Sequence, residues 1–358
     1  MNSSMTPPRL SSTLLEAFKD QDKVFAPAFA ILQEAINQQA FPAASITVTH
    51  AGSLVALKAL GSSTYEAGAP SSSRSLREGG DFDFAVHPTT LFDLASLTKV
   101  VATTTAAMLL YERGLLDLEA PISAIVPEFT TDAAKDPRRH EATLRMLLAH
   151  SSGLPAHEKF FLKARTRAEL LEAAFTTPLA VDPATHAEYS DVGFIILGVA
   201  LERLSDESLD RFCQREIFAP LAMTHTTFNP PQEIRAKIPP TADDQTFRRR
   251  IVQGEVQDEN ASVLGGVAPH AGLFSTAEDL AKFAQAMLNQ GSPILRPETV
   301  ALFTRRQSTP PGTSRALGWD TPSPQSQSGK YFSPQSFGHL GYTGTSLWID
   351  PTRQLSIT

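Results

Sequence analysis

The segment LFDLASLTKVVATTTAAML, residues 91–109, decides how the rest of the chain can be interpreted. It is rich in Ala and Leu, and we expect a helix over Leu94–Leu116. Ser96 and Lys99 stand three residues apart where this helix begins, so their side chains share one face. The partial positive charge at a helix N-terminus favours a developing alkoxide. The spacing therefore makes Ser96 a candidate nucleophile beside a candidate base.

Lys99 can serve as that base only if its proton affinity is lowered. A serine hydroxyl is a poor nucleophile at neutral pH and needs an adjacent base. The Leu, Val and Ala side chains around Lys99 predict burial, which lowers the pKa of an ammonium group. A plainer interpretation stays open, in which Ser96 is a helix N-cap and Lys99 a solvated side chain.

A second segment, HAEYSDVGFIILG at residues 186–198, places a phenol just before another helix. A tyrosine there can shuttle a proton between a nucleophile and a leaving group if nearby cations favour its phenolate. Tyr189 is therefore a candidate acid–base group. The alternative is a tyrosine at the edge of the core, with Asp191 capping the helix that follows.

A third segment, FGHLGYTGTSLWIDP at residues 337–351, combines glycines with a strand pattern. Gly338, Gly341 and Gly344 allow a backbone to approach a substrate closely. A strand edge here can donate an N–H group to an oxyanion, with the Ser96 N–H as the second donor. The alternative is a glycine-rich edge strand without a role in chemistry.

Together the motifs SLTK, YSD and HLG, in that order, resemble those of the serine β-lactamase and penicillin-binding protein superfamily. The branch that holds class C β-lactamases, D,D-peptidases and family VIII esterases is the most similar. Two further segments are typical of it, LRMLLAHSSGLP at residues 144–155 and LGGVAPHAGLFSTAEDLAKF at residues 264–283. The resemblance covers roughly residues 25–358.

The resemblance implies a mechanism through an acyl-enzyme. Ser96 would attack a carbonyl carbon, and Lys99 and Tyr189 would share the general-base and general-acid work. The implied activity is that of a serine hydrolase acting on esters or amides, of the carboxylesterase or D,D-carboxypeptidase type, with β-lactamase activity at most weak. The alternative from another class is a penicillin-binding sensor or scaffold that binds without turnover.

The resemblance also implies a set of substrate-binding residues. The N–H groups of Ser96 and Tyr342 would form the oxyanion hole, and Gly341 lies in the same motif. His339 would orient the substrate and tune the phenol electrostatically. Asp191 would hydrogen-bond Lys99 or an amide of the substrate.

Two positions depart from the pattern of the superfamily. Asp191 stands where β-lactamases usually have Asn, and an ionised carboxylate can only accept hydrogen bonds. It should stabilise protonated Lys99 and repel a substrate carboxylate. His339 and Leu340 replace the usual Lys and Thr, which removes a hydroxyl that contacts such a carboxylate. Both changes favour an esterase or peptidase over a dedicated β-lactamase.

The expected fold is α+β, with the β-lactamase/transpeptidase-like arrangement of one antiparallel sheet built from both chain ends and flanked by helices. The domain plan is a polar leader over residues 1–24 and one hydrolase domain over 25–358. Its α/β part covers about 25–95 and 275–358, and its helical part about 96–274. The final strand and a C-terminal helix look truncated.

Smaller elements follow from local patterns. We expect helices over Phe25–Gln38, Val192–Leu204 and Ala277–Asn289, the last with Ser275 or Thr276 as its cap. AASITVTHAG and LVALKALG predict a β-hairpin. Loops are expected over the following ranges: 62–88, 224–270 and 305–336.

Charge and composition exclude several classes of partner. The net charge of −7 argues against a nucleic-acid partner, and Arg248–Arg250, the densest basic run, is expected to be a solvated loop. No histidine, cysteine and carboxylate cluster has metal-ligand spacing, so we expect neither metal nor cofactor. We expect a small-molecule or peptide substrate, and the oligomeric state stays open.

No apolar run is long enough to be a membrane span or a signal segment. A cytoplasmic location is therefore expected, or a periplasmic or secreted one if the start is misassigned. No Gly-x-Ser-x-Gly elbow is present, so the chemistry does not point to an α/β-hydrolase.

Overall fold

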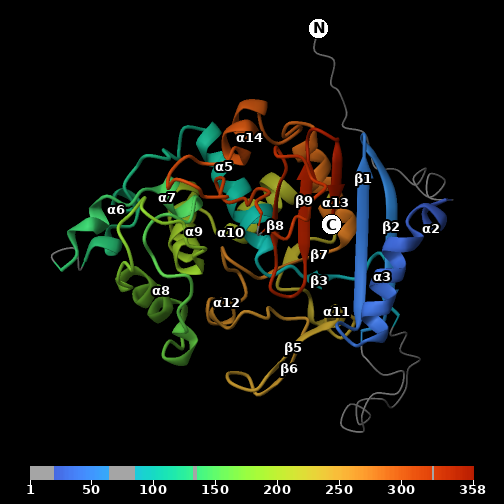
Figure 1. Ribbon diagram of the computed structural model, residues 1–358. Helices are drawn as coiled ribbons and strands as arrows, with labels where there is room; N and C mark the ends of the chain where they lie inside the picture. Colours follow the sequence, from blue (N-terminus) through green and yellow to red (C-terminus); the bar gives the residue numbers. More distant parts are fainter. Residues whose placement is uncertain (1–19, 64–84, 132–134, 325) are drawn as a thin grey trace.

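The computed structural model describes residues 20–63, 85–131, 135–324 and 326–358. Its centre is a five-stranded antiparallel sheet with the strand order β2-β1-β10-β9-β8 (Figure 1). The strands are β1 (Ala43–His50), β2 (Ser53–Gly61), β8 (Phe337–Leu340), β9 (Ser346–Asp350) and β10 (Leu355–Ile357). The sheet joins both ends of the chain, which confirms the expected α+β fold class.

The first two strands form the hairpin that the sequence predicts. Ala51 and Gly52 make the turn with positive φ angles of 48° and 81°, a backbone that glycine adopts without strain. On its other side β1 pairs with β10, with Val48 opposite Ile357. This pairing places the N-terminal and C-terminal strands side by side.

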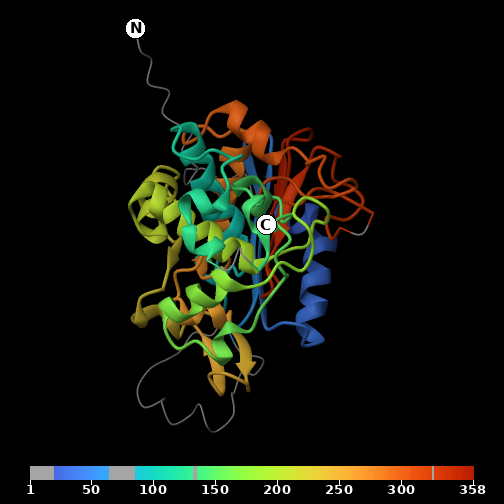
Figure 2. The ribbon, with the colours of Figure 1, turned by 90° about the vertical axis from the view of Figure 1, so that its left-hand side faces the viewer.

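Helices cover both faces of the sheet. On one face α3 (Ala26–Asn37) packs through Phe29 against Val48, and α2 (Gln21–Val24) contacts β2 through Gln21 Oε1, which accepts the Leu57 N–H at 3.0 Å. On the other face α13 (Ala277–Leu288) lies across β1, β9 and β10. Figure 2 shows α3 on one side of the sheet and the helical part of the molecule on the other. The sheet is therefore the middle layer of three.

The helical part is built around α9 (Asp191–Ser205), which contacts most of its neighbours. Every residue from Val192 to Leu201 is buried, as expected for a helix that is apolar all round. The surrounding helices are α5 (Thr105–Glu112), α6 (Ile122–Ile125), α7 (Leu144–Leu148), α8 (Arg167–Thr176), α10 (Leu209–Cys213) and α14 (Pro297–Thr304).

The helix expected over Leu94–Leu116 is shorter than its apolar pattern. It begins with a π-helical segment, η1 (Lys99–Thr104), and continues as α5. Ala95 has a positive φ of 45°, which a right-handed helix cannot include, and Gly114 with a φ of 68° ends the other side. The nucleophile candidate thus sits in the turn before the helix.

The segment 224–270 is not the irregular loop that we expected. It contains β4 (Thr227–Phe228), α11 (Gln232–Arg235), α12 (Glu259–Val263) and a hairpin of β5 (Pro240–Asp244) and β6 (Arg250–Gln253). These elements are two to five residues long, too short for their periodicity to stand out in the sequence. A second sheet, β3-β7-β4, joins β3 (Phe92–Asp93) to β7 (Leu273–Ser275).

Other elements predicted from the sequence have nearly the same bounds in the structure. α3 and α13 occupy the expected ranges, and the Thr276 hydroxyl caps α13 by accepting the Asp279 N–H at 3.1 Å. Most of the predicted loop 62–88 and most of the predicted leader lie outside the described residues. The division of the chain into domains stays a prediction. Within the described ranges, no helix combines the length and the apolar character that crossing a bilayer requires.

Candidate active site

Ser96 is placed by the turn that links β3 to η1. β3 pairs with β7, Phe92 opposite Ser275, so the start of the turn is fixed in a sheet. The Asp93 carboxylate then accepts the N–H of Ala95 at 2.8 Å, which holds the residue with positive φ. The Ser96 carbonyl accepts the Lys99 N–H at 3.0 Å as the helical segment begins. The hydroxyl is thereby presented at the head of a buried helix.

Lys99 is completely buried, with a relative exposure of 0%. Its ammonium group lies 3.0 Å from Ser96 Oγ, 3.0 Å from the carbonyl oxygen of His270 and 2.6 Å from Asp191 Oδ1. An ammonium group has three N–H donors, and each has an acceptor here. The interpretation of Lys99 as a solvated side chain is therefore wrong.

The charge of Lys99 differs from the expectation based on burial alone. Burial lowers the pKa of Lys99, but the negative charge of Asp191 and the hydrogen bond to it, together with Tyr189, more than offset this and raise the pKa. Burial likewise raises the pKa of Asp191, yet Lys99 and His157 outweigh it and hold that pKa below its usual value. The two groups form a buried ion pair in which Asp191 stabilises protonated Lys99, as expected from the acidic residue at this position. The expectation that burial lowers the pKa of Lys99 is wrong, because the effect of Asp191 is larger.

Tyr189 reaches Ser96 from the start of α9. Its hydroxyl donates to Ser96 Oγ at 2.7 Å, and its ring lies 4.7 Å from the ammonium group of Lys99. Burial raises the pKa of Tyr189, so the phenol is protonated at neutral pH. The cap of α9 is Ser190, which accepts the Gly193 N–H at 3.0 Å. Asp191 is therefore free to pair with Lys99 instead of capping the helix.

Two buried imidazoles flank the phenol. The rings of His150 and His339 lie 4.8 Å and 5.6 Å from the Tyr189 ring. Burial, reinforced by the cations Lys99 and Arg315, lowers the pKa of His339 to about 3. Burial and the same cations also hold the pKa of His150 far below its usual value. Both rings are neutral, so His339 contacts the phenol without bringing a positive charge to it.

The third motif is tied directly to the turn of the nucleophile. Thr343 Oγ1 donates to the Asp93 carbonyl at 2.6 Å, and Thr345 Oγ1 donates to the Leu94 carbonyl at 2.9 Å. A Cβ atom on Gly341 would collide with both the Leu94 carbonyl and Thr345 Oγ1. A glycine is needed there because two backbone segments meet. Gly338 instead leaves room for the Trp348 ring, away from the substrate side.

These groups line a cleft of about 960 Å³. Its walls include Ser96, Tyr189, Asp191, His339, Gly341 and Tyr342, all of which the sequence pointed to. The Tyr342 side chain is 86% exposed at the mouth. The structure thus brings all predicted site residues to one cavity, with Lys99 beneath Ser96. The described residues contain no group of three or more His, Cys, Asp or Glu side chains suited to a metal ion.

Sequence reasoning missed several residues of the cleft. Arg315, His157 and Phe161 line it but belong to no motif. Arg315 lies 5.4 Å from the Tyr189 ring, and its nearest carboxylate is Asp320 at 3.9 Å. Arg315 lies 24 residues before the third motif in a stretch without helix or strand, so no local sequence pattern indicated its role.

Comparison with known proteins identifies the family. Residues 28–358 match the family described as Beta-lactamase. The chain belongs to the β-lactamase family. A relative from Escherichia coli (strain K12), named "Putative D-alanyl-D-alanine carboxypeptidase", is 36% identical over 75% of this chain and 68% of its own length. A relative from Bacillus subtilis (strain 168), named "N-acetylmuramyl-L-alanine amidase", is 35% identical over 75% of this chain and 67% of its own.

Solved structures agree with this β-lactamase-family fold. EstCE1, described as a hydrolase with promiscuous acyltransferase activity, superposes with a TM-score of 0.73 at 19% identity, covering 94% of this chain and 93% of its own. A class C β-lactamase from Rhodobacter sphaeroides gives a TM-score of 0.66 at 22% identity, covering 92% of each chain. The protein is a serine hydrolase of the β-lactamase family, and the comparisons give no support to the non-hydrolytic alternative.

Proposed function

We propose that the protein hydrolyses ester or amide bonds through an acyl-enzyme on Ser96, with Lys99 and Tyr189 controlling the protons. One observation carries this assignment: Ser96 Oγ lies within hydrogen-bond distance of both the Lys99 ammonium group and the Tyr189 hydroxyl. A serine that only capped a helix would need neither partner. The two contacts come from segments 90 residues apart in sequence, which favours a built catalytic site.

In this proposal Lys99 acts as a fixed positive charge. Its three N–H groups are occupied by Ser96, Asp191 and His270, and its pKa is raised by Asp191. Accepting a further proton is therefore impossible in the resting state. A buried ammonium group beside Oγ stabilises the negative charge that develops on that oxygen during attack.

Tyr189 then serves as the proton relay. During acylation the hydrogen bond between the Ser96 and Tyr189 hydroxyls reverses, Ser96 Oγ bonds to the carbonyl carbon, and the Ser96 proton passes to the Tyr189 oxygen. Tyr189 releases its own proton to the leaving oxygen or nitrogen as the bond from carbon to that atom breaks. The phenol is neutral before and after the step, which suits its raised pKa. Deacylation runs the same relay from an attacking water to Ser96 Oγ.

Two backbone donors are available for the oxyanion. Within the described part of the chain, neither the Ser96 N–H nor the Tyr342 N–H has a protein acceptor. Both residues line the cleft. Gly341, beside Tyr342, is held against Leu94 by the packing described above, which keeps the third motif close to the nucleophile. Such donors act mainly on the transition state.

The substrate class follows from the polar groups around the relay. The Asp191 carboxylate forms an ion pair with Lys99, and the His339 ring is neutral. Arg315 brings a guanidinium group to the same wall, and the nearby Asp320 carboxylate accepts hydrogen bonds from Ser314 Oγ at 2.7 Å and the Thr321 N–H at 3.0 Å. We therefore expect carboxylic esters and D-amino-acid peptides with a free carboxylate to be the preferred substrates. We expect cephalosporins to be the poorest substrates, because Leu340 and Asp191 lack the hydrogen-bond donors expected of a β-lactamase.

A side-by-side rate comparison tests the substrate class. The substrates are p-nitrophenyl acetate, a D-Ala-D-Ala peptide and a chromogenic cephalosporin. We expect measurable ester hydrolysis and weak or absent cephalosporin hydrolysis. A cephalosporin rate well above the ester rate would overturn the substrate assignment.

Intact mass after treatment with a fluorophosphonate tests the nucleophile. We expect one adduct on the wild-type protein and none on Ser96→Ala. Ser346→Ala is the matched control, because Ser346 lines the same cleft; it should keep the adduct. An adduct that survives Ser96→Ala would remove the nucleophile from the proposal.

A further inference from the structure

Asp93 is a buried carboxylate that the proposed chemistry does not use. Its exposure is only 2%, and each oxygen accepts a backbone N–H. Oδ1 accepts from Ala95 at 2.8 Å, and Oδ2 accepts from Gln257 at 2.7 Å. Ala95 is the residue with a φ of 45° immediately before Ser96. A non-glycine residue persists in that region only when its surroundings fix it, and Asp93 supplies part of that restraint.

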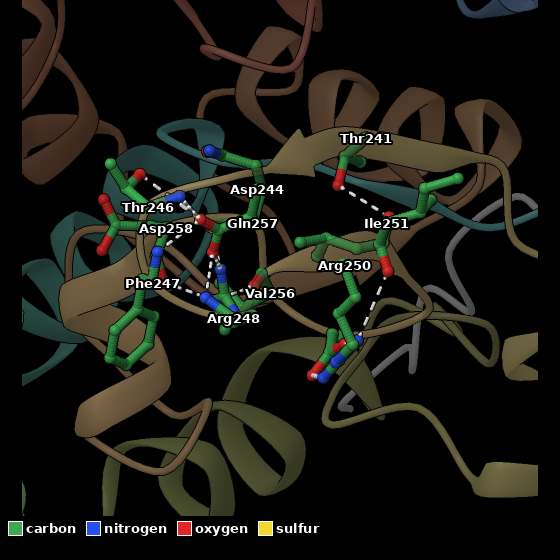
Figure 3. A network of polar contacts seen from close by, with 12 residues as sticks. Thr241, Asp244, Thr246, Phe247, Arg248, Arg250, Ile251, Val256, Gln257 and Asp258 are labelled. Atoms are coloured by element: carbon green, nitrogen blue, oxygen red, sulfur yellow. Dashed lines mark hydrogen bonds and ion pairs between the residues drawn. The ribbon is translucent and has the colours of Figure 1, made fainter.

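The second donor to Asp93 belongs to a segment that is itself held by one side chain. Arg248 lies in the turn between β5 and β6, and its side chain is only 6% exposed. The guanidinium group donates to the carbonyl oxygens of Val256 at 2.8 Å, Gln257 at 3.1 Å and Asp258 at 3.3 Å. Figure 3 shows these contacts converging on Arg248. The expectation of a solvated basic loop is thus wrong for this arginine.

The guanidinium group is in turn oriented by Asp244. Asp244 Oδ2 accepts from Arg248 Nη1 at 3.0 Å and from the Arg248 N–H at 3.0 Å, while Oδ1 accepts the N–H of Phe247 at 2.8 Å (Figure 3). A buried arginine needs this pairing, because an unpartnered buried charge is costly. The turn, the salt bridge and the three carbonyl contacts form one unit.

We propose that Arg248 is a positioning residue for the nucleophile. It fixes the segment Val256–Asp258, so that the Gln257 N–H holds Asp93, and Asp93 holds the turn that presents Ser96. The same contacts place Asp258 in the wall of the cleft. The hairpin that carries Arg248 thereby links substrate binding to the geometry of attack. This inference rests on the proposed role of Ser96.

The protonation of Asp93 gives this link a measurable signature. Burial raises the pKa of Asp93 to about 6, although the N–H donors Ala95 and Gln257 oppose the shift. The charged groups that face it are Asp258, which raises the pKa, and Arg248, which lowers it.

In the part of the chain that the structure describes, β7 pairs with Asp93 through Phe274, and the segment after β8 contacts its carbonyl oxygen through Thr343; neither side chain titrates. Above about pH 6 the carboxylate accepts both N–H groups. Below that pH one oxygen carries a proton, and the restraint on the turn weakens.

The experiment compares ester hydrolysis by the wild type, Arg248→Met, Arg248→Lys and Asp93→Asn between pH 5 and 9. For Arg248→Met we expect kcat to fall by about 10- to 100-fold, because small misplacements of reacting groups cost that much. KM should change less, and Arg248→Lys should recover only part of kcat, since a lysine cannot reach three carbonyls together. Arg249→Met is the matched control on the neighbouring exposed arginine and should match the wild type.

Asp93→Asn tests the inference independently, because a folding defect of the arginine variants would not affect its result. An amide oxygen accepts only one of the two N–H groups, so we expect kcat to be reduced. We expect wild-type activity to decline below about pH 6, and this decline should be absent in Asp93→Asn. Unchanged kcat in Arg248→Met, or a wild-type pH profile in Asp93→Asn, would overturn the inference. The proposed function fails separately, namely if Ser96→Ala keeps its activity or its fluorophosphonate adduct.

Discussion

Lys99 and Asp191 form a buried ion pair in which Nζ lies 2.6 Å from Oδ1. The pair joins the helix of the nucleophile to the start of α9, and Tyr189 lies two residues before Asp191 on the same approach. One contact therefore sets both the charge of Lys99 and the place of the phenol.

Replacing Asp191 by Asn should make Lys99 titrate at a lower pH. The pKa of Lys99 is raised because Asp191 outweighs the effect of burial. Without the carboxylate charge, burial dominates and the pKa falls. The wild type should keep kcat/KM up to pH 10, whereas Asp191→Asn should lose activity as the pH rises and the ammonium group deprotonates.

A pH–rate profile between pH 6 and 10 measures this effect. Asp182→Asn, which alters an exposed pair with Arg138, is the matched control and should follow the wild type. A flat profile for Asp191→Asn up to pH 10 would show that Asp191 does not set the charge of Lys99.

Replacing Tyr189 by Phe should remove the proton relay but leave the cleft intact. The ring contacts with His150 and His339 survive, whereas the hydroxyl that lies 2.7 Å from Ser96 Oγ is lost. We expect kcat for ester hydrolysis to fall by about 10²- to 10⁴-fold, the usual contribution of a positioned acid–base group. KM should remain within a few fold of the wild-type value, as steady-state kinetics would show.

Tyr111→Phe is the control for this change, since Tyr111 packs against Phe303 at a ring distance of 5.8 Å, on another helix. Its activity should equal that of the wild type. If Tyr189→Phe retained more than about a tenth of the wild-type kcat, the relay would have to be assigned to another group.

Much of this site could be predicted from the sequence because its motifs are local. Ser96 and Lys99 share one helical turn, and Tyr189 immediately precedes an apolar helix, so residue type and spacing were informative. The charge of Lys99 was harder to predict from the sequence, because it depends on a contact with Asp191, which lies 92 residues away along the chain. The sequence showed that Asp191 was acidic but could not weigh its attraction against burial.

The groups that complete the cleft could not be predicted for a different reason. Arg315 and Asp258 of the cleft lie in turns and connecting segments, and so does Arg248, which bonds the Gln257 carbonyl; periodicity gives no signal there. Arg248 stands in a basic run that resembles a solvated surface, and only the fold reveals the three carbonyl oxygens it bonds. Such residues are identified by long-range packing alone.

Replacing Arg315 by Met should weaken the binding of substrates that carry a carboxylate. Arg315 is 22% exposed in the cleft beside Tyr189, and a partly buried guanidinium group binds a carboxylate through paired hydrogen bonds. We expect KM for a D-Ala-D-Ala peptide to rise by about 10- to 100-fold, the effect of losing a charged hydrogen bond. KM for p-nitrophenyl acetate, which has no free carboxylate, should not change.

Arg305→Met serves as the control, because Arg305 is an exposed residue of the same connecting segment. A peptide with an amidated C-terminus provides the complementary test, since its KM should be the same in the wild type and in Arg315→Met. Equal increases in KM for the acid and the amide would mean that Arg315 supports the shape of the cleft and does not bind a carboxylate.

Replacing Gly341 by Ala should separate the third motif from the nucleophile. The new methyl group would collide with the Leu94 carbonyl and with Thr345 Oγ1, which are themselves bonded to each other at 2.9 Å. Because a backbone carbonyl cannot rotate away, β8 must shift relative to Ser96. We expect slower fluorophosphonate labelling and a loss of about 1–3 kcal/mol in the free energy of unfolding, typical of overpacking.

Gly344→Ala distinguishes this collision from simple backbone strain. Gly344 has a φ of 88°, but no atom lies within 4 Å of the position of its Cβ. Its substitution should therefore cost stability through strain while the labelling rate of Ser96 stays close to that of the wild type. Denaturant unfolding gives the first quantity and time-resolved intact mass gives the second. If both variants lost stability equally and labelled at the same rate, the contact between Gly341 and Leu94 would have no part in positioning the nucleophile.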